Sequence, residues 1–260
     1  MALSARGLVL RYRRTGDVLR GADLDLRAGE VVAFVGLNGA GKSTLLRALA
    51  GLLAPAEGTV LLDGRPLAAR SRAECARAIA FVPQALAALP PATVRRFVLG
   101  GRYAHLDFWR TPRAADHAAV ERALHAADIL GLRDRPLAEL SGGELQRAMF
   151  ARALAQEAGV LLCDEPVAAL DLPHQLGILD LLAGLAGEGC TVAFSTHDLN
   201  LAAQYADRVV VLHGGAIRAQ GPPGEALDAG VVREVWGARV CVDRTADGRV
   251  RITPARSVSW

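Results

Sequence analysis

The chain has 260 residues, a length that fits one large domain or two small ones. Hydrophobic residues make up 52% and charged residues 22%, a balance that excludes a disordered chain. No apolar run reaches the roughly 18 residues of a membrane span and no signal-peptide core is found, so a cytoplasmic protein is expected. The net charge of +3 is too weak to favour nucleic acid, and the four cysteines lack metal-ligand spacing.

The first third of the sequence predicts strands and one helix. Alternating apolar residues predict two paired antiparallel strands at 7–12 and 18–26. The continuous apolar run 31–35 is typical of a strand buried on both faces, and a glycine-rich turn and a helix that ends at Gly51 follow it. Two shorter strands are expected at 59–62 and 78–82.

The middle of the chain differs in composition. From about 85 to 158 it is rich in Ala, Arg and Leu with helical periodicity, which predicts an inserted helical subdomain. A hairpin is expected at 208–220, turning at the Gly214-Gly215 pair. The intervening strand and helix signals are at 160–163, 173–187, 190–195 and 198–205. This alternation predicts an α/β fold with a mostly parallel core sheet covered by helices.

The strongest motif is Gly-Leu-Asn-Gly-Ala-Gly-Lys-Ser at residues 36–43, which fits G-x-x-x-x-G-K-[ST] between a buried strand and a helix. Its glycines allow backbone N–H groups to surround phosphate oxygens at a helix N-terminus. Lys42 would reach the β- and γ-phosphates, and Ser43 would offer a hydroxyl to Mg²⁺. Of the 30 basic residues, the single lysine falls at this position, where a compact ammonium suits the site better than a guanidinium.

An acidic pair, Asp164 and Glu165, follows the apolar run 160–163. A phosphate-binding loop needs an acid on a neighbouring strand to hold Mg²⁺, so Asp164 would face the metal. Glu165 would face the γ-phosphate and polarise the attacking water. The alternative is an acidic pair at a surface turn, which the phosphate-binding motif makes the weaker interpretation.

The segment Leu-Ser-Gly-Gly-Glu at 140–144 precedes a helical run. Ser141 and Glu144 fit a capping box, which alone is the better interpretation. However, Gly142 and Gly143 would be costly in a first helical turn unless their N–H groups must approach an anion.

The combined motifs resemble those of the ATP-binding-cassette (ABC) ATPases over about residues 7–220. Six segments carry the resemblance: 36–44 (Walker A), 81–84 (Q-loop), 140–144 (signature), 160–166 (Walker B), 168–171 (D-loop) and 195–198 (H-loop). The resemblance implies an ABC ATPase domain over 1–220, with an N-terminal antiparallel β subdomain, the helical subdomain inserted, and 221–260 as its C-terminal extension.

The resemblance also implies roles for individual residues, with ATP and Mg²⁺ as cofactors. The implied catalytic residues are Glu165, His197 and Gln84, and the implied Mg²⁺-site residues are Ser43, Gln84 and Asp164. Tyr12 lies where the family has an aromatic that stacks on adenine. The other implied nucleotide contacts are Gly36, Asn38, Gly39, Ala40, Gly41, Lys42, Ser43, Thr44, Ser141, Gly142, Gly143 and Asp171.

The family implies a head-to-tail homodimer, with each ATP between the Walker A loop of one chain and the signature turn of the other. Two separate integral-membrane permease subunits and, indirectly, a secreted or periplasmic substrate-binding protein are implied as partners. The chain is then expected at the cytoplasmic face of the membrane, as a peripheral subunit, with no role for nucleic acid.

Subclass signals favour metal-chelate uptake. Residues 92–105 resemble importers of iron–siderophore, haem and cobalamin, although Ala104 replaces the proline of their Gly-Arg-x-Pro-His segment, and 171–175 resembles the same subgroup. The alternatives are a zinc, manganese or molybdate importer, a soluble ABC ATPase of DNA repair or translation, and, with least support, a P-loop kinase.

Residues 85–110 are expected to dock onto a permease because they combine arginines with aromatics. The alternative is that the aromatics pack inside the helical subdomain. The residues concerned are Arg95, Arg96, Arg102, Tyr103, Phe108 and Trp109.

Overall fold

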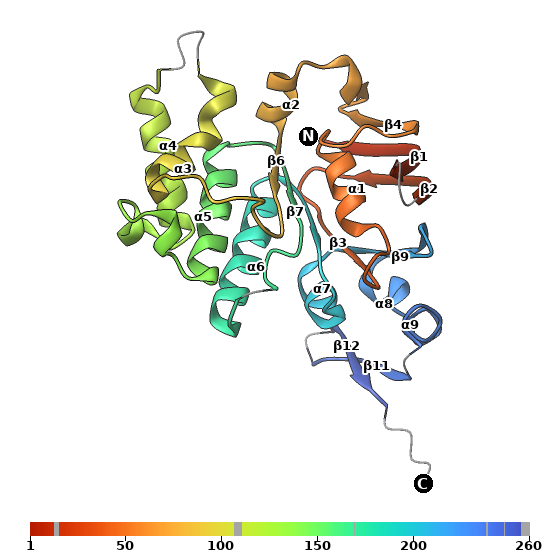
Figure 1. Ribbon diagram of the computed structural model, residues 1–260. Coiled ribbons are helices and arrows are strands. Elements are labelled where there is room, and N and C mark those ends of the chain that lie inside the picture. The colour runs from red at the N-terminus through yellow and green to blue at the C-terminus, as the bar shows by residue number, and fades with distance from the viewer. Residues whose placement is uncertain (13–15, 107–110, 169, 238, 247, 256–260) are drawn as a thin grey trace.

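The computed structural model describes residues 1–260 except 13–15, 107–110, 169, 238, 247 and 256–260. Figure 1 shows a central sheet with a helical region beside one edge, an antiparallel sheet on the other side, and a small hairpin leading to the C-terminus. Within the described residues, no helix is long and apolar enough to cross a membrane.

The antiparallel sheet has the strand order β2-β1-β4-β5. Its strands are β1 (Leu3–Tyr12), β2 (Gly16–Leu26), β4 (Glu57–Leu62) and β5 (Arg65–Pro66). In β1 and β2 the alternating apolar residues face one side and are buried, as the sequence pattern predicts. Leu3 pairs with Leu26 at one end of the two strands, and Tyr12 pairs with Gly16 at the other.

The central sheet has the order β10-β9-β3-β8-β7-β6. The strands from β9 to β6 are parallel, and β10 is an antiparallel edge strand that forms the predicted hairpin with β9. The strands are β3 (Val31–Gly36), β6 (Ile79–Val82), β7 (Val160–Cys163), β8 (Thr191–Ser195), β9 (Arg208–His213) and β10 (Ala216–Gly221). The mixed α/β fold, with a mostly parallel sheet and an N-terminal antiparallel sheet, is therefore confirmed.

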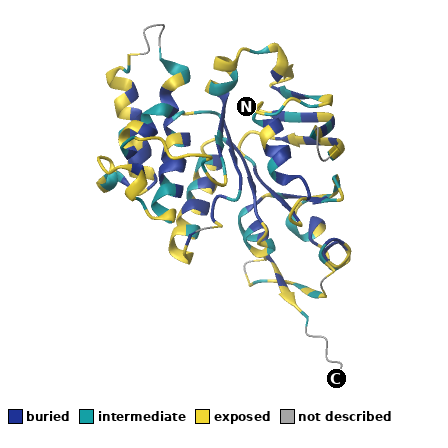
Figure 2. Cartoon of the chain, viewed as in Figure 1, coloured by how far each residue is buried: buried dark blue, intermediate teal, exposed yellow. Residues whose placement is uncertain are grey.

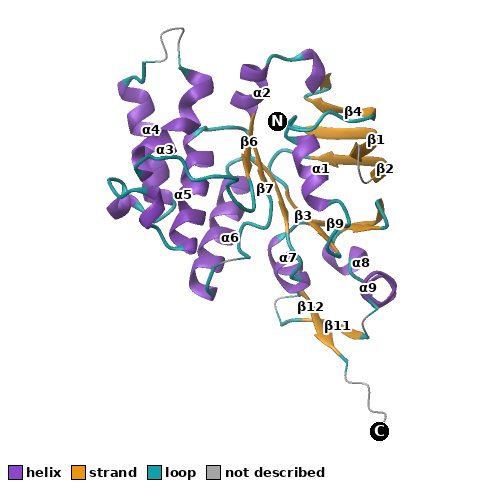
Figure 3. Cartoon of the chain, in the orientation of Figure 1, coloured by secondary structure: helices purple, strands orange, loops and turns teal. Residues whose placement is uncertain are grey.

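Nine α-helices are found in the described residues, and helices are coloured purple in Figure 3. They are α1 (Lys42–Leu49), α2 (Arg72–Ala78), α3 (Val94–Leu99), α4 (Ala114–Ala126), α5 (Gly142–Ala155), α6 (Leu172–Gly187), α7 (Leu199–Tyr205), α8 (Pro223–Ala226) and α9 (Ala229–Trp236). Helix α2 was not predicted from the sequence. Its signal was present, because Ser71 and Glu74 form a capping box, with Ser71 N–H donating to Glu74 Oε2 at 2.7 Å.

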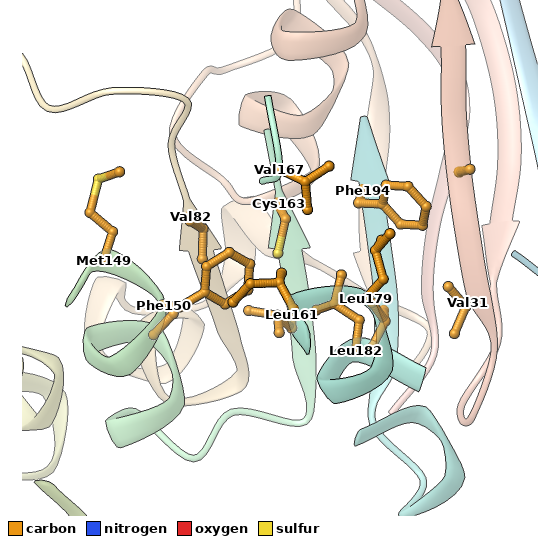
Figure 4. Close-up of a cluster of buried hydrophobic side chains, with 14 of the residues drawn as sticks. Val31, Val82, Met149, Phe150, Leu161, Cys163, Val167, Leu179, Leu182 and Phe194 are labelled. Carbon is orange, nitrogen blue, oxygen red and sulfur yellow. The ribbon is translucent and has the colours of Figure 1, made fainter. Parts of the chain in front are cut away.

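The central sheet separates two hydrophobic cores. Its strands are dark blue in Figure 2 because their residues are buried, whereas the helices beside them carry buried, intermediate and exposed residues. On one face, Leu161 and Cys163 of β7 pack with α5 and α6 (Figure 4). On the other face, Val160 and Leu162 pack with α1 and the antiparallel sheet. Neighbouring residues of a strand point to opposite faces, so α1 and α5 lie on opposite sides of the sheet.

Arg102 differs from its expected position on an exposed docking surface. Its side chain is only 8% exposed, and its Nε donates to Asp116 Oδ1 at 2.9 Å, while its Nη1 lies 2.7 Å from Glu157 Oε2. The exposed interpretation was wrong because the carboxylates that bury this guanidinium lie far from it in the sequence. Phe108 and Trp109 lie outside the described residues.

The C-terminal residues add a separate hairpin, β11 (Val240–Arg244) and β12 (Val250–Pro254). Val250 and Ile252 are buried in the core that also contains α7 and α9. The hairpin is thus packed onto the same side of the sheet as the helices that follow β8.

Candidate active site

The loop between β3 and α1 needs glycine at specific positions. A Cβ on Gly36 would lie 2.3 Å from the carbonyl oxygen of Leu212 in β9, a distance no side chain tolerates. Gly41 has φ 102°, a backbone conformation that strongly favours glycine, and a Cβ there would also approach Val18 of β2. The loop is thus held tightly between the two sheets, with its N–H groups at the start of α1.

Lys42 is the first residue of α1, directly after this loop, and only 6% of its surface is exposed. Its Nζ donates to the carbonyl oxygens of Gly36 at 2.8 Å and Leu37 at 3.2 Å. Burial lowers the pKa of this ammonium, and the nearby carboxylates of Glu165 and Asp164 oppose that effect. A phosphate in the loop would give the ammonium a stronger, charged partner than these carbonyls.

Asp164 directly follows β7 and links this strand to α1 and to β8 at the carboxyl edge of the sheet. Its Oδ1 accepts from Ser43 Oγ at 2.9 Å and from Ser195 Oγ at 2.8 Å. The carboxylate is only 1% exposed, and its Oδ2 has no hydrogen-bond partner among the described residues. A buried carboxylate oxygen without a partner is costly unless a cation or ordered water binds it. With the Ser43 hydroxyl beside it, the oxygen donor set fits Mg²⁺.

Glu165 has a strained backbone, with φ 48° in the left-handed region. Its N–H donates to Ser195 Oγ at 2.9 Å, which holds that conformation. Its Oε2 accepts from Gln84 Nε2 at 3.0 Å and lies 3.8 Å from His197 Nδ1. The ends of β6, β7 and β8 therefore bring together the three predicted catalytic residues, which are far apart in the sequence.

The signature turn begins α5, as its capping box predicts. Ser141 N–H donates to Glu144 Oε2 at 2.7 Å, and Ser141 Oγ accepts from Glu144 N–H at 3.3 Å. This geometry does not explain Gly142, because a Cβ there would meet nothing within 4 Å in this chain. Helices α5 and α1 pack on opposite faces of the sheet, so the signature turn and the phosphate-binding loop lead into helices of different layers.

Tyr12 and Asp171 have defined positions, and their contacts with nucleotide stay predictions. Tyr12 ends β1 opposite Gly16, at the end of the antiparallel sheet where β2 meets the loop before α1. Asp171 caps α6, accepting from His174 N–H at 3.3 Å and from the His174 imidazole, which lowers the pKa of Asp171. Ala169 of the predicted D-loop lies outside the described residues.

Two residues that hold the loops at this edge were not predicted from the sequence, Ser195 and Gln175. Ser195 bonds both Asp164 and the Glu165 backbone, although it was noted only as the start of the H-loop. Gln175 Nε2 donates to the carbonyl oxygens of Val167 and Leu170 and so holds the loop after β7. A hydroxyl at a buried strand end beside an acidic strand end was the available signal for Ser195.

The fold and this arrangement define a P-loop nucleoside triphosphatase, in which a glycine-rich loop leads into a helix that begins with a buried lysine and a serine, and two carboxylates follow β7 at the same edge of the sheet. The profile of the ABC transporter family matches residues 19–168. The chain belongs to that family and is an ABC-type ATPase, which binds and hydrolyses ATP.

Similarity to known proteins extends over nearly the whole chain. The chain is 46% identical to the hemin import ATP-binding protein HmuV of Nocardia farcinica over 99% of this chain and 90% of that protein. It is 42% identical to the cobalamin import ATP-binding protein BtuD of Halobacterium salinarum over 98% of this chain and 64% of that protein. Among solved structures, an inward-facing metal-chelate type ABC transporter matches with a TM-score of 0.84 and 28% identity, covering 98% of both chains.

A bacterial ABC transporter cassette solved as a dimer also matches. Its TM-score is 0.77 at 27% identity, and the match covers 85% of this chain and 98% of that one. Similar cassettes are therefore found both in a transporter and as dimers.

Proposed function

We propose that this chain hydrolyses ATP to drive import of a metal chelate, namely haem, cobalamin or an iron siderophore, through separate permease subunits. The observation that carries the proposal is the similarity over 98–99% of the chain to hemin and cobalamin import ATPases. The similarity includes the C-terminal hairpin, which lies beyond the segment that the family profile matches.

The site geometry supports a division of labour in hydrolysis. Lys42 and the loop N–H groups would bind the phosphates, and Ser43 and Asp164 would hold Mg²⁺, which neutralises phosphate charge when bound. Glu165 would take the proton from the attacking water, because its carboxylate lies at the open end of β7 and is oriented by Gln84. His197 is 64% exposed beside it and would contact the γ-phosphate.

A second copy of the chain would complete this site. Gly142 is exposed at the start of α5, and the space where a Cβ would lie is empty in this chain, so a nucleotide bound by a partner could approach its N–H. Two apolar side chains on the same edge support a covering surface, Leu37 in the phosphate-binding loop at 44% exposure and Leu172 after the D-loop at 64%.

The permease would dock in a groove of about 900 Å³ between the C-terminal end of α1, α2, α3 and α5. Phe81 and Leu86, on either side of Gln84, line it, so a partner seated there would lie next to a residue that contacts Glu165. This placement replaces the docking surface expected around Arg102.

The charge of this groove indicates the chemistry of its partner. Among its described lining residues the charged side chains are Arg70, Arg72 and Arg152, and none is acidic. The Arg152 guanidinium lies 4.8 Å above the Phe97 ring and has no ion-pair partner in the described chain. The groove therefore suits an apolar helix that carries a carboxylate.

Uptake measurements test the proposed cargo. A strain lacking the gene should lose uptake of one of haem, cobalamin or an iron siderophore, and the parental gene should restore it while Glu165→Gln should not. Normal uptake of all three chelates, with lost uptake of zinc, manganese or molybdate, would contradict the metal-chelate assignment.

Copurification tests the groove separately. Arg152→Glu should weaken copurification with the permease, while Arg233→Glu on the exposed surface of α9 serves as the matched charge reversal. Equal copurification of both variants with the parental chain would place the docking surface elsewhere.

A further inference from the structure

The C-terminal hairpin is hydrogen-bonded to α7 by two amide side chains. Asn200 Nδ2 donates to the Ile252 carbonyl at 3.1 Å, and Asn200 Oδ1 accepts from Ile252 N–H at 2.8 Å. Gln204 Nε2 donates to the Val250 carbonyl at 3.0 Å. The backbone groups on this edge of β12 are thus satisfied by a helix in place of a neighbouring strand.

The spacing of the two amides fits the strand. Residues four apart on a helix face are separated by about 6 Å along the axis. Residues two apart on a strand are separated by about 6.6 Å, and their backbone groups point to the same edge. Asn200 and Gln204 therefore reach Ile252 and Val250 together, and a shift of either element by one residue would break both contacts.

The contact lies close to the hydrolytic site. Asn200 is in the first turn of α7, three residues after His197, and Asp198 caps that turn by accepting from the N–H groups of Asn200 and Leu201 at 2.8 and 3.0 Å. The far end of α7 is held separately, by Tyr205 donating to Asp180 of α6 at 3.2 Å.

The side chain of His197 is held by few contacts. Its side chain is 64% exposed, and its Nδ1 is 3.8 Å from Glu165 Oε2, beyond hydrogen-bond distance. Its position therefore depends on the backbone of the turn that leads into α7. Among the described residues, Ile252 is the one that bonds the side chain of Asn200 in that turn.

We propose that the C-terminal hairpin positions His197 for ATP hydrolysis, with Asn200 as the positioning residue that joins β12 to the first turn of α7. The inference rests on the proposed contact of His197 with the γ-phosphate. It gives residues 240–254 a role in the ATPase cycle, and the chemistry stays with Glu165 and His197.

The test compares Asn200→Leu, which keeps the side-chain shape and removes both hydrogen bonds, with Thr253→Val. Thr253 lies on the same strand, pairs with β11 and is exposed, so its substitution controls for a polar-to-apolar change in the hairpin. We expect Asn200→Leu to lower kcat by roughly three- to tenfold, the order set by losing one or two net hydrogen bonds. KM and equilibrium ATP binding should stay within about twofold, because the phosphate-binding loop is untouched.

The same change on a His197→Ala background separates positioning from general destabilisation. Asn200→Leu should then have no further effect on kcat, since residues that act through one group are not additive. An unchanged kcat in Asn200→Leu, or an equal loss on both backgrounds, would overturn the positioning role and leave the role of His197 intact. A fully active His197→Ala variant would overturn both.

A milder variant covers the case in which Asn200→Leu fails to fold. Asn200→Asp keeps the acceptor for Ile252 N–H and loses the donor to the Ile252 carbonyl. The kcat of Asn200→Asp should lie between that of the parental chain and that of a chain that lacks both hydrogen bonds. This intermediate effect is again expected only when His197 is present. A parental kcat in this folded variant would count against the proposal.

Discussion

Ser195→Ala should weaken both the fold and the hydrolytic step. The Ser195 hydroxyl is fully buried, donates to Asp164 Oδ1 at 2.8 Å and accepts from Glu165 N–H at 2.9 Å. The substitution removes one hydrogen bond to a charged group and one to a backbone N–H, so unfolding should become easier by about 2–4 kcal/mol. For a chain of this size the melting temperature should fall by roughly 5–15 °C.

The catalytic effect follows from the Glu165 backbone. A non-glycine residue at φ 48° costs about 1–3 kcal/mol, and the bond from Glu165 N–H to Ser195 helps to hold it there. Without that bond the carboxylate should move away from the position in which Gln84 orients it. Because displacements of about 1 Å can cost a hundredfold, we expect hydrolysis at saturating ATP to fall about tenfold or more.

The assay is phosphate release at saturating ATP, together with equilibrium ATP binding and thermal unfolding. ATP binding should change little, since Lys42 and the glycine loop are retained. Thr191→Val is the matched control, because Thr191 is a buried hydroxyl residue at the other end of β8, where it bonds the Met1 carbonyl. The control should unfold earlier and hydrolyse normally. Parental hydrolysis by Ser195→Ala would refute the link between this hydroxyl and Glu165.

Three substitutions test the roles of single charged side chains. Lys42→Arg should abolish most ATPase activity in a phosphate-release assay, because a planar guanidinium cannot fit the buried position between the Gly36 and Leu37 carbonyls; near-parental turnover would contradict this. Glu165→Gln should bind ATP and persist as a dimer in gel filtration with ATP and Mg²⁺, whereas normal hydrolysis would show that another group is the base. Arg102→Met should lower the free energy of unfolding by about 3–5 kcal/mol by leaving a buried carboxylate unpaired, and a parental denaturation midpoint would disagree.

Asp116, the buried carboxylate beside Arg102, should make stability depend on pH. The Arg113 N–H, and then the Arg102 guanidinium, lower the pKa of Asp116 in the folded chain. A lowered folded-state pKa gives stability that is complete above the ordinary carboxyl pKa and is lost as pH falls through the folded value. Acid unfolding curves should therefore be flatter for Asp116→Asn, and an unchanged slope would exclude this contribution.

The sequence by itself determined the parts of this protein that depend on local backbone requirements. The run 31–35 followed by a glycine-rich loop and a helix predicts the phosphate-binding loop, because Gly41 and its neighbours impose a conformation on adjacent residues. The alternation of strand and helix signals likewise predicts the parallel sheet, since parallel strands need helical crossovers between them. The capping box at Ser141 was predicted in the same way, from four consecutive residues.

Only the tertiary structure decided which distant groups share a site or a core. Ser43 and Asp164 lie 121 residues apart and meet because β3 and β7 end at the same edge of one sheet. Arg102 lies in an arginine-rich stretch, and its sequence neighbours predict a surface residue. In the folded chain the carboxylates of Asp116 and Glu157 contact its guanidinium. The contact of Asn200 with Ile252 depends on a hairpin that folds back onto α7. Composition and periodicity do not predict this contact, because side-chain partners are set by where the elements pack and not by their spacing along the chain.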